Sequence, residues 1–351
     1  MADLTFIESL PKAELHLHLE GSVDPRTLVE LRRRHNIPLP GDGNQYGFDA
    51  ESGKELTEQD VRELYQYKDF VGFLMAFKAV SQRLRTPDDY ELITYRLMQK
   101  LAAQNVKHAE VYVSVGVIHW RGQEPDPIFE GLERGRERGQ RDFGVSLLWI
   151  FDAVRHFGAE AAQRVFEKAV QYRDRNVVGV GIGGDEVRGP AEWFERQYAY
   201  AKDHGLRLTV HAGESAGPES IAAAVNLLHA ERIGHGLTAI RDPRVVELLV
   251  ERQVAVEVCL SSNLRTGCCA RIEDHPLKQY LDAGVLVTLN TDDPEMFGTT
   301  LNREYQLAQD TFGFGNTELA RLANHSFRAA FLPDAQKQQI TTSHSSVVPE
   351  L

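Results

Sequence analysis

The segment KAELHLH (residues 12–18) places two imidazoles, His16 and His18, two positions apart in a predicted short strand. Side chains two apart in a strand point to the same face, so these two rings converge while the neighbouring leucines face the other way. Two convergent imidazoles are typical of a metal site. The alternative is that both rings form the polar face of an edge strand, and the rest of the chain must decide between the two.

Further polar groups occur where other predicted strands end. Strand four leads to Gly184, strand five to His211 and Glu214, strand six to His235, and strand eight to Asp292 and Asp293. Ionisable groups scattered at random would not follow strand ends so consistently, which favours a metal site. His16, His18, His211 and Asp292 supply three imidazoles and a carboxylate, a set that suits Zn²⁺ with one position left for water. We therefore expect one zinc ion per chain.

The strands that would carry these groups are eight short apolar segments separated by helical stretches. They span residues 12–18, 107–115, 144–151, 177–184, 207–213, 232–236, 254–262 and 285–293. Regular alternation of this kind predicts an α/β protein with a single (β/α)8 TIM barrel, in which the carboxyl ends of the strands carry the active site. A doubly wound open sheet is the second choice, but no G-x-G-x-x-G motif follows the first strand.

Two segments fall outside the repeat. Residues 25–101 form an expected helical insertion between the first and second strands, in which Phe70, Phe73, Leu74 and Phe77 recur at helical spacing. We expect this face to lie over the barrel mouth, with Phe70 and Phe73 against the substrate; a helix that merely faces the core is the alternative. Residues 1–333 would form one domain, followed by a polar, flexible tail over 334–351.

Composition limits the partners. The chain has 351 residues, 42% of them hydrophobic, and a formal net charge of −12, which disfavours nucleic acid and anionic membranes and favours small-molecule ligands. We find no signal peptide and no apolar run long enough to span a bilayer, so we expect a cytoplasmic protein that could form a homo-oligomer. The odd set Cys259, Cys268 and Cys269 predicts reduced thiols rather than disulfides or a cysteine-bound metal.

Six motifs in order, ELHLHLEG, GGDE, HAGE, RIGHG, SSNLRTG and TLNTDDPEMFGTTLNREY, closely resemble the adenosine deaminase family of the amidohydrolase superfamily. The resemblance extends from about residue 11 to residue 330. It implies a zinc barrel enzyme that hydrolyses the 6-amino group of a purine and releases ammonia. Many binuclear relatives carry a carbamylated lysine after strand four, but VVGVGIGGDEVRG contains none, so a single metal is expected.

Roles for individual residues follow from the resemblance. Glu214 would donate a proton to purine N1, and such a general acid typically contributes about 10²- to 10⁴-fold to the rate. His235 would orient or deprotonate the attacking water. Gly184 would donate its backbone N–H to N3, and Asp293 would bond N7 and help to hold the attacking oxygen. His18 would also contact the substrate.

The substrate itself remains open between three purines. Adenosine, converted to inosine, is the first expectation, and Glu20 would then bind its 5′-hydroxyl where many relatives have Asp. The second is 6-aminodeoxyfutalosine, a menaquinone intermediate whose 5′ side carries a carboxyphenyl group that Arg265 or Arg188 could bind; Arg265 is the better candidate because it follows strand seven directly. The third is adenine, because adenine deaminases share HLEG, although Thr291 argues against that branch. A different zinc hydrolase or a catalytically inactive binding protein would be the alternatives of another class.

Overall fold

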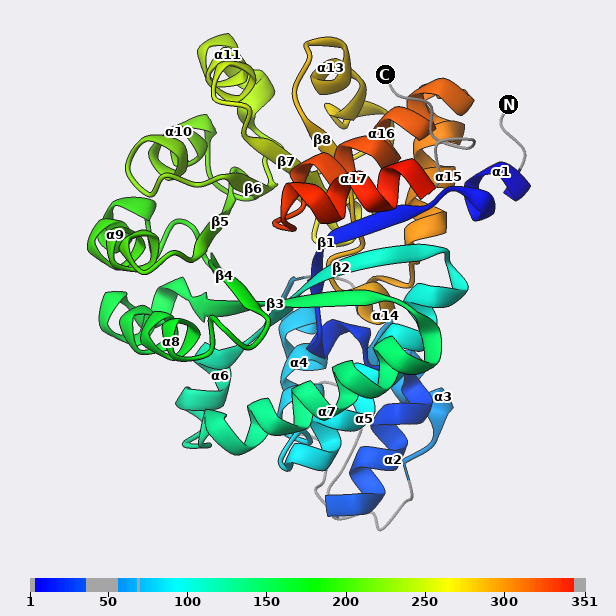
Figure 1. Cartoon of the computed structure of the whole chain (residues 1–351), viewed down its shortest axis with the longest axis vertical. Coiled ribbons are helices and arrows are strands. Elements are labelled where there is room, and N and C mark those ends of the chain that lie inside the picture. Colours follow the sequence, from blue (N-terminus) through cyan, green and yellow to red (C-terminus); the bar gives the residue numbers. More distant parts are fainter. Residues whose placement is uncertain (1–3, 36–55, 68–69, 344–351) are drawn as a thin grey trace.

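The computed structural model describes residues 4–35, 56–67 and 70–343, with the backbone alone for residues 70, 71 and 339–343. Eight parallel strands follow one another around a barrel in sequence order (Figure 1). The strands are β1 Lys12–His18, β2 Val106–Val113, β3 Ser146–Val154, β4 Val177–Gly183, β5 Arg207–Ala212, β6 Arg232–His235, β7 Ala255–Val258 and β8 Val287–Leu289. The predicted TIM barrel is confirmed.

The barrel closes between β1 and the residues that follow β8. Backbone bonds run from His18 N–H to the Asp292 carbonyl (2.7 Å) and from Asp292 N–H to the His16 carbonyl (3.0 Å). One layer below, the side-chain oxygen of Asn290 accepts hydrogen bonds from the N–H groups of Leu15 (2.8 Å) and His16 (3.1 Å). The seam of the barrel is therefore built from, and next to, the residues predicted to bind metal.

Helices surround the barrel and contribute an insertion. The described helices with eight or more residues are α2 Pro25–His35, α4 Phe70–Ser81, α5 Pro87–Ala103, α7 Pro125–Phe143, α8 Ala159–Gln171, α9 Glu195–Asp203, α10 Pro218–Asn226, α11 Pro243–Glu251, α15 Leu301–Phe312, α16 Asn316–Ala329 and α17 Asp334–Ser343. Shorter ones are α1 Leu4–Ser9, α3 Glu58–Leu64, α6 Val115–Trp120, α12 Leu260–Arg265, α13 Leu277–Asp282 and α14 Pro294–Phe297. Among the described residues, no helix is long and apolar enough to cross a lipid bilayer.

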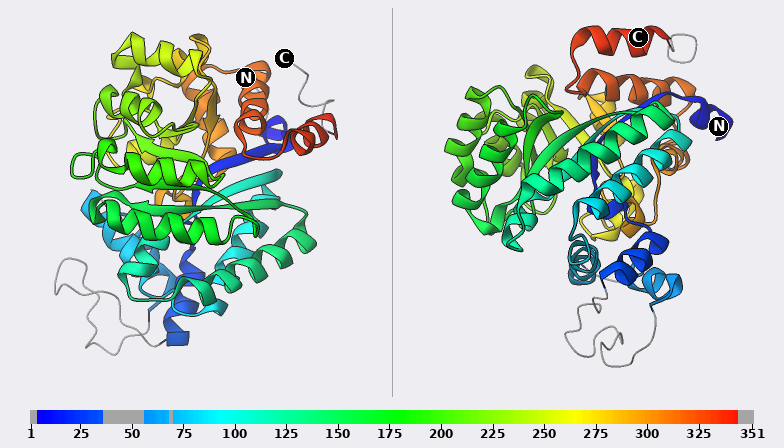
Figure 2. Two further views of the ribbon diagram at one scale, coloured as in Figure 1. Left: turned by 60° about the vertical axis from the view of Figure 1, so that its left-hand side comes forward. Right: turned by 60° about the horizontal axis from the view of Figure 1, so that its bottom comes forward.

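Helices α2 to α5 form the predicted insertion between β1 and β2. Figures 1 and 2 show them together on one side of the molecule, with α16 and α17 on the opposite side. Helix α5 packs closely on α7 because Gly131, Gly135 and Gly139 recur every fourth residue on one face of α7. A Cβ at Gly131 would lie 2.0 Å from the Pro87 carbonyl oxygen, so a larger residue cannot occupy this helix contact.

Helix α17 was not predicted. It occupies much of the segment 334–351 that we expected to be a flexible tail, and residues 344–351 lie outside the described part of the chain. The single-domain boundary at residue 333 and the flexibility of the tail stay predictions.

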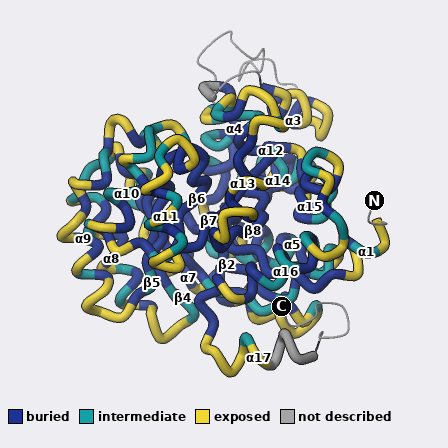
Figure 3. The backbone as a smooth tube through the Cα atoms, turned by 90° about the horizontal axis from the view of Figure 1, so that it is seen from above, coloured by how far each residue is buried: buried dark blue, intermediate teal, exposed yellow. Residues whose placement is uncertain are grey.

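A buried charge network lies inside the barrel, at the end opposite to the carboxyl ends of the strands. The strands are buried and the outer faces of the helices are exposed (Figure 3). The Arg232 guanidinium pairs with the carboxylates of Glu110 and Glu257, its Nε lying 2.6 Å from Glu257 Oε1 but not aligned for a hydrogen bond. Its Cζ lies 3.7 Å above the ring of Phe331, from the segment after α16. This cation balances two carboxylates that no water reaches.

Arg232→Met should destabilise the protein strongly, because it leaves Glu110 and Glu257 buried without their cation. Loss of one partner of a buried pair costs about 3–5 kcal/mol, measurable as the free energy of unfolding in urea. The matched control is Arg244→Met, whose side chain pairs with Asp242 but is 87% exposed, and which should change stability far less because solvent screens an exposed pair. Equal, small effects of both substitutions would contradict the interpretation.

Candidate metal and active site

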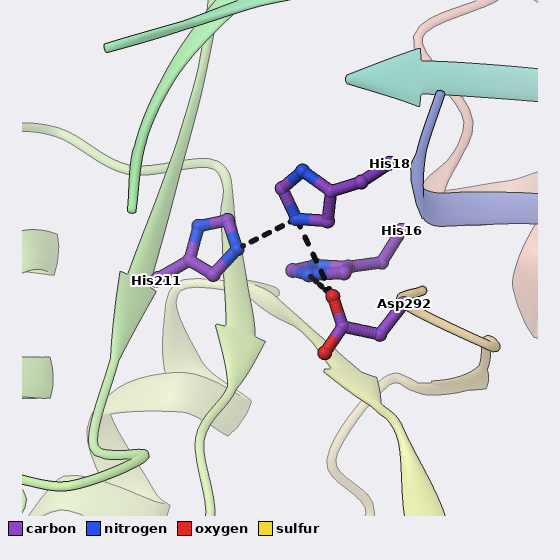
Figure 4. Close-up of side chains that lie close together, drawn as sticks. All are labelled: His16, His18, His211 and Asp292. Carbon is purple, nitrogen blue, oxygen red and sulfur yellow. Dashed lines mark hydrogen bonds and ion pairs between the residues drawn. The ribbon is translucent and has the colours of Figure 1, made fainter. Parts of the chain in front are cut away.

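Four side chains converge at the carboxyl ends of the strands (Figure 4). His16 and His18 come from β1, His211 from β5, and Asp292 from the residues after β8. His18 Nε2 lies 3.2 Å from His211 Nε2, and Asp292 Oδ1 lies 3.3 Å from His18 Nε2 and 3.6 Å from His16 Nε2. All four residues are buried, and their potential ligand atoms lie within 4.8 Å of one another. The geometry brings together the four residues predicted from strand ends.

The chemistry of these atoms fits a divalent cation. His16 Nδ1 lies 2.8 Å from Glu257 Oε2 and His211 Nδ1 lies 3.0 Å from the Ile182 carbonyl, which assigns the ring proton to Nδ1 in both. Their Nε2 lone pairs then face the centre, where His16 Nε2 is buried without a hydrogen bond. Burial lowers the pKa of His18 to about 4 and holds that of His211 well below its usual range, which favours neutral rings. Against the effect of burial, the carboxylates of Asp292 and Glu257 raise the pKa of His16 to about 10, so a metal ion would have to displace a proton from this ring. Neutral imidazoles with oriented Nε2 atoms are typical zinc ligands.

Two residues that the sequence analysis missed hold this set in place. Glu257 on β7 accepts from His16 and, at 3.2 Å, from the hydroxyl of Tyr112. Ser262 donates its hydroxyl to Asp292 Oδ2 at 2.7 Å. The only sequence signal for Glu257 is a charged residue within the apolar strand VAVEV. Such supporting hydrogen bonds orient metal ligands and set their basicity.

The backbone is bent where the strands end. His235 and Asp292 have positive φ values of 63° and 64°, a conformation that non-glycine residues rarely adopt, and Gly184 has φ of 95°. Strain of this kind is kept where the surrounding structure imposes it, commonly at functional sites. Here it turns two polar side chains and one backbone segment at the ends of three strands.

Glu214 is held beside the metal set by another carboxylate. Glu186, from the GGDE motif, accepts the backbone N–H groups of Gly213 (2.8 Å), Glu214 (2.8 Å) and Ser215 (2.9 Å). This fixes the loop after β5 and places Glu214 Oε2 3.8 Å from His235 Nε2. Burial raises the pKa of Glu214, which favours its protonated form. Glu186 therefore positions the predicted proton donor, a role the sequence analysis did not assign.

His235 lies between the predicted acid and the metal set. Its Nε2 is 3.9 Å from Asp292 Oδ2, and its Nδ1 accepts a hydrogen bond from the Asn263 side-chain amide at 3.1 Å. Asn263 in turn lies 3.2 Å from His275 Nε2. With Nδ1 occupied as an acceptor, the neutral His235 ring carries its proton on Nε2, facing the site.

Three buried carboxyl groups border the same space, and each has an oxygen without a partner: Glu20 Oε2, Asp152 Oδ1 and Asp293 Oδ1. Glu20 Oε1 accepts from Ser114 N–H at 3.1 Å, and burial raises the pKa of Glu20 to about 7. Burial likewise raises the pKa of Asp152 to about 8. Asp293 lies so close to Gly21 that a Cβ there would come 1.9 Å from Asp293 Oδ1. Glu20 and Asp293 were predicted to contact substrate; Asp152 was not.

The predicted aromatic cover lies partly within the described residues. The ring of Phe73 on α4 stacks on Phe297 (5.2 Å between centroids, 14° between planes) and lies 5.9 Å from Tyr67. Phe297 belongs to α14, which follows Asp293 directly. The helix therefore covers the strand-eight side of the site, whereas the side chain of Phe70 lies outside the described residues.

The two predicted arginines have different surroundings. Arg265 donates from Nη2 to the Tyr65 carbonyl at 2.8 Å, and its guanidinium lies 4.7 Å from the ring centroid of Tyr67. Arg188 is exposed after β4 and forms no ion pair with the described residues. Burial and then the charge of Arg188 lower the pKa of His156, whose Nδ1 lies 3.1 Å from where a Cβ of Gly184 would be. Arg188 is thus the freer cation at the mouth.

Comparison with known proteins decides the family. The sequence profile described as adenosine deaminase matches residues 11–345. The chain belongs to the adenosine deaminase family. This confirms the resemblance of the motifs and identifies the protein as a hydrolytic deaminase of the amidohydrolase type.

Relatives in the adenosine deaminase family carry several substrate names. An aminodeoxyfutalosine deaminase of Streptomyces avermitilis is 36% identical over 338 residues, covering 96% of this chain and 90% of the relative. An adenine deaminase structure from Arthrobacter aurescens has a TM-score of 0.88 at 32% identity, covering 97% of this chain and 100% of that one. A Burkholderia ambifaria amidohydrolase structure with bound Zn has a TM-score of 0.85 at 25% identity, covering 98% and 92%. Together with the His/Asp set, these comparisons indicate a divalent metal site.

Glu257→Gln should weaken metal binding, because the neutral amide can no longer stabilise the His16 ring as the carboxylate does. Loss of such a supporting hydrogen bond typically costs about 10- to 100-fold in metal affinity, measurable by competition with a chromophoric chelator. The control is Glu133→Gln on α7, a buried carboxylate that accepts from Trp149 Nε1 at 2.7 Å outside the site. Equal metal affinity in both variants would contradict the role of Glu257.

Proposed function

We propose that the protein hydrolyses the 6-amino group of 6-aminodeoxyfutalosine and releases ammonia, in menaquinone biosynthesis. The observation that carries deamination is the partly buried acid Glu214, 3.8 Å from His235 and beside three imidazoles and a carboxylate. The substrate is favoured by the similarity to aminodeoxyfutalosine deaminase along nearly the whole chain. Adenosine, our first expectation from the sequence, has weaker support, because the similar relatives are named aminodeoxyfutalosine and adenine deaminases.

The residues would divide the chemistry as follows. Zn²⁺, the metal we propose for His16, His18, His211 and Asp292, would supply an activated water by lowering its pKa to about 7. His235, whose Nδ1 accepts from Asn263, would orient that water through its Nε2–H. Attack at C6 breaks the aromaticity of the ring and places charge on N1, where Glu214 would deliver a proton.

Purine binding would use both edges of the ring. The exposed N–H of Gly184, at the end of β4, would donate to N3. Asp293, after β8, would bond N7; burial and its neighbour Asp292 raise the pKa of Asp293 well above its usual range, so it would bind as the acid that donates a hydrogen bond. These contacts orient C6 toward the metal and N1 toward Glu214.

The position of N9 indicates which arginine would meet the carboxyphenyl group. N9 lies between N3 and N7 on the purine perimeter, so its substituent leaves the ring between the ends of β4 and β8. The side toward β5 holds Glu214 and N1, and the substituent must therefore pass over β1, β2 and β3. Arg188 follows β4 and borders this side, whereas Arg265 follows β7 and is engaged with Tyr65 and Tyr67.

Adenine is a second candidate, favoured by the similarity to the adenine deaminase structure, which extends over 97% of this chain. Glu20 of the HLEG motif fits it as well, because a buried Glu can fill part of the space that a sugar would need.

Ammonia release by the zinc-loaded protein tests the proposal directly, with 6-aminodeoxyfutalosine, adenosine and adenine compared by kcat/KM. We expect 6-aminodeoxyfutalosine to be fastest. Glu214→Gln should retain the metal and lose about 10²- to 10⁴-fold in kcat, because the amide cannot protonate N1. Turnover of adenine alone would replace the proposed substrate, and a fully active Glu214→Gln would remove the role of Glu214.

Arg188→Ala should lower kcat/KM for 6-aminodeoxyfutalosine about 10- to 100-fold, the cost of one charge-assisted hydrogen bond, and leave adenosine unchanged. Arg265→Ala provides the contrast. Because Arg265 supports Tyr65 and Tyr67, its loss should affect both substrates alike. A selective loss for the carboxylated substrate in Arg265→Ala, with none in Arg188→Ala, would reverse the assignment.

A further inference from the structure

Asp152 is a buried carboxyl group inside the barrel that the mechanism above does not use. It lies on β3 opposite Gly181 of β4, and its side chain is turned toward the glycines of that strand. A Cβ at Gly181 would lie 3.0 Å from Asp152 Oδ1, and one at Gly183 would lie 3.4 Å from Oδ2 and 3.3 Å from His211 Cε1. The absence of side chains at positions 181 and 183 makes room for this carboxyl group beside the metal set.

The Asp152 carboxyl group lowers the stability of the folded protein, because it is buried without a partner. Asp152 is 5% exposed, and its side chain makes no hydrogen bond or ion pair with the described residues; Oδ1 is wholly buried without a partner. Arg155, the nearest cation in sequence, instead donates to the carbonyls of Gly189 (3.1 Å) and His211 (2.6 Å). A buried polar atom without a hydrogen bond lowers the stability of the folded protein, and a new hydrogen bond to that group would offset this cost. Oδ2, which lies beside Gly183 and His211 and is not wholly buried, is the oxygen that an external ligand can reach, and such a ligand would supply a hydrogen bond there.

We propose that Asp152 binds a hydroxyl group of the substrate's sugar and so selects nucleosides over free bases. This inference rests on the proposed function, in which the purine is anchored by Gly184 and Asp293.

The position of Asp152 matches the path of the sugar. The substituent on N9 must pass over β1, β2 and β3, and this sector holds two carboxyl groups with an unpartnered oxygen, Glu20 after β1 and Asp152 on β3. Ser114, after β2, already donates its N–H to Glu20. Carboxyl oxygens are good acceptors for the hydroxyls of a sugar.

A second metal ion is a poorer occupant for this place. The side chains nearest to Asp152 across the two glycines are Tyr112, whose ring edge lies 2.9 Å from a Cβ position at Gly181, and His211, whose Nδ1 is engaged with the Ile182 carbonyl. Neither of these side chains offers a further ligand, whereas a metal ion requires several. A neutral hydroxyl needs only one acceptor.

The test compares Asp152→Ala and Asp152→Asn with the wild-type, zinc-loaded protein on nucleosides and on adenine. We expect kcat/KM for 6-aminodeoxyfutalosine and adenosine to fall about 10- to 100-fold, mainly through KM, with any turnover of adenine unchanged. Calorimetry gives a readout without catalysis: inosine should bind more weakly to the variants, and hypoxanthine equally well. Adenosine analogues lacking single hydroxyls should then identify the one whose removal abolishes the difference.

Thr94→Val is the matched control, because Thr94 Oγ1 on α5 is also buried without a hydrogen-bond partner but lies outside the barrel. It should leave every ratio unchanged. Equal losses for nucleosides and adenine, or a lowered metal content, would assign Asp152 to the metal centre and overturn the inference. Unchanged nucleoside kinetics in both Asp152 variants would also overturn it while leaving the proposed function intact. A wild-type protein inactive on all nucleosides would refute the proposed function and, with it, the sugar contact.

Discussion

The closure of the barrel between β1 and β8 is the constraint on which the site depends. Strand β8 is only three residues long, and beyond it the pairing with β1 consists of the backbone bonds between Asp292 and the two histidines. The Asn290 side chain replaces a strand neighbour where the regular ladder has ended. Because the same residues close the barrel and point into its mouth, the geometry of the candidate metal site depends directly on how the barrel closes.

Charge connects the two ends of the barrel interior. Arg232, which contacts the Phe331 ring at the closed end, pairs with Glu257, and Glu257 accepts from His16 at the open end. With a metal ion bound by the histidine and aspartate set, as we propose, Glu257 would lie between two cations, Arg232 at the closed end and the metal ion at the open end. Buried carboxylates of this kind are tolerated when they are paired and hydrogen-bonded. Stability and metal affinity should therefore respond together to changes in this network.

Sequence reasoning located the candidate metal ligands because strand periodicity and strand ends are local properties: His16 and His18 share a face, and His211 and Asp292 end their strands. It could not find Glu257, Ser262 or Asn290, whose partners lie far away in the chain and meet them only once the barrel closes. In the sequence Asp152 is an ordinary polar residue, and only the structure shows that it faces the glycines of β4. Arg265 gives no sign in the sequence of its bond to Tyr65. Helix α17 was missed because its Gln-, Ser- and Thr-rich composition lacks an apolar stripe.

The seam also has a consequence for biosynthesis. The hydrogen bonds of Asn290 to Leu15 and His16 span 275 and 274 positions, so the first strand must await nearly the whole chain before it gains its second neighbour. Until residue 292 has left the ribosome, the two histidines of β1 lack their carboxylate, and β1 presents an open edge. Contacts of such long range slow folding and expose edges to mispairing. A nascent chain of this enzyme is therefore most in need of chaperones late in synthesis, shortly before its last strand emerges.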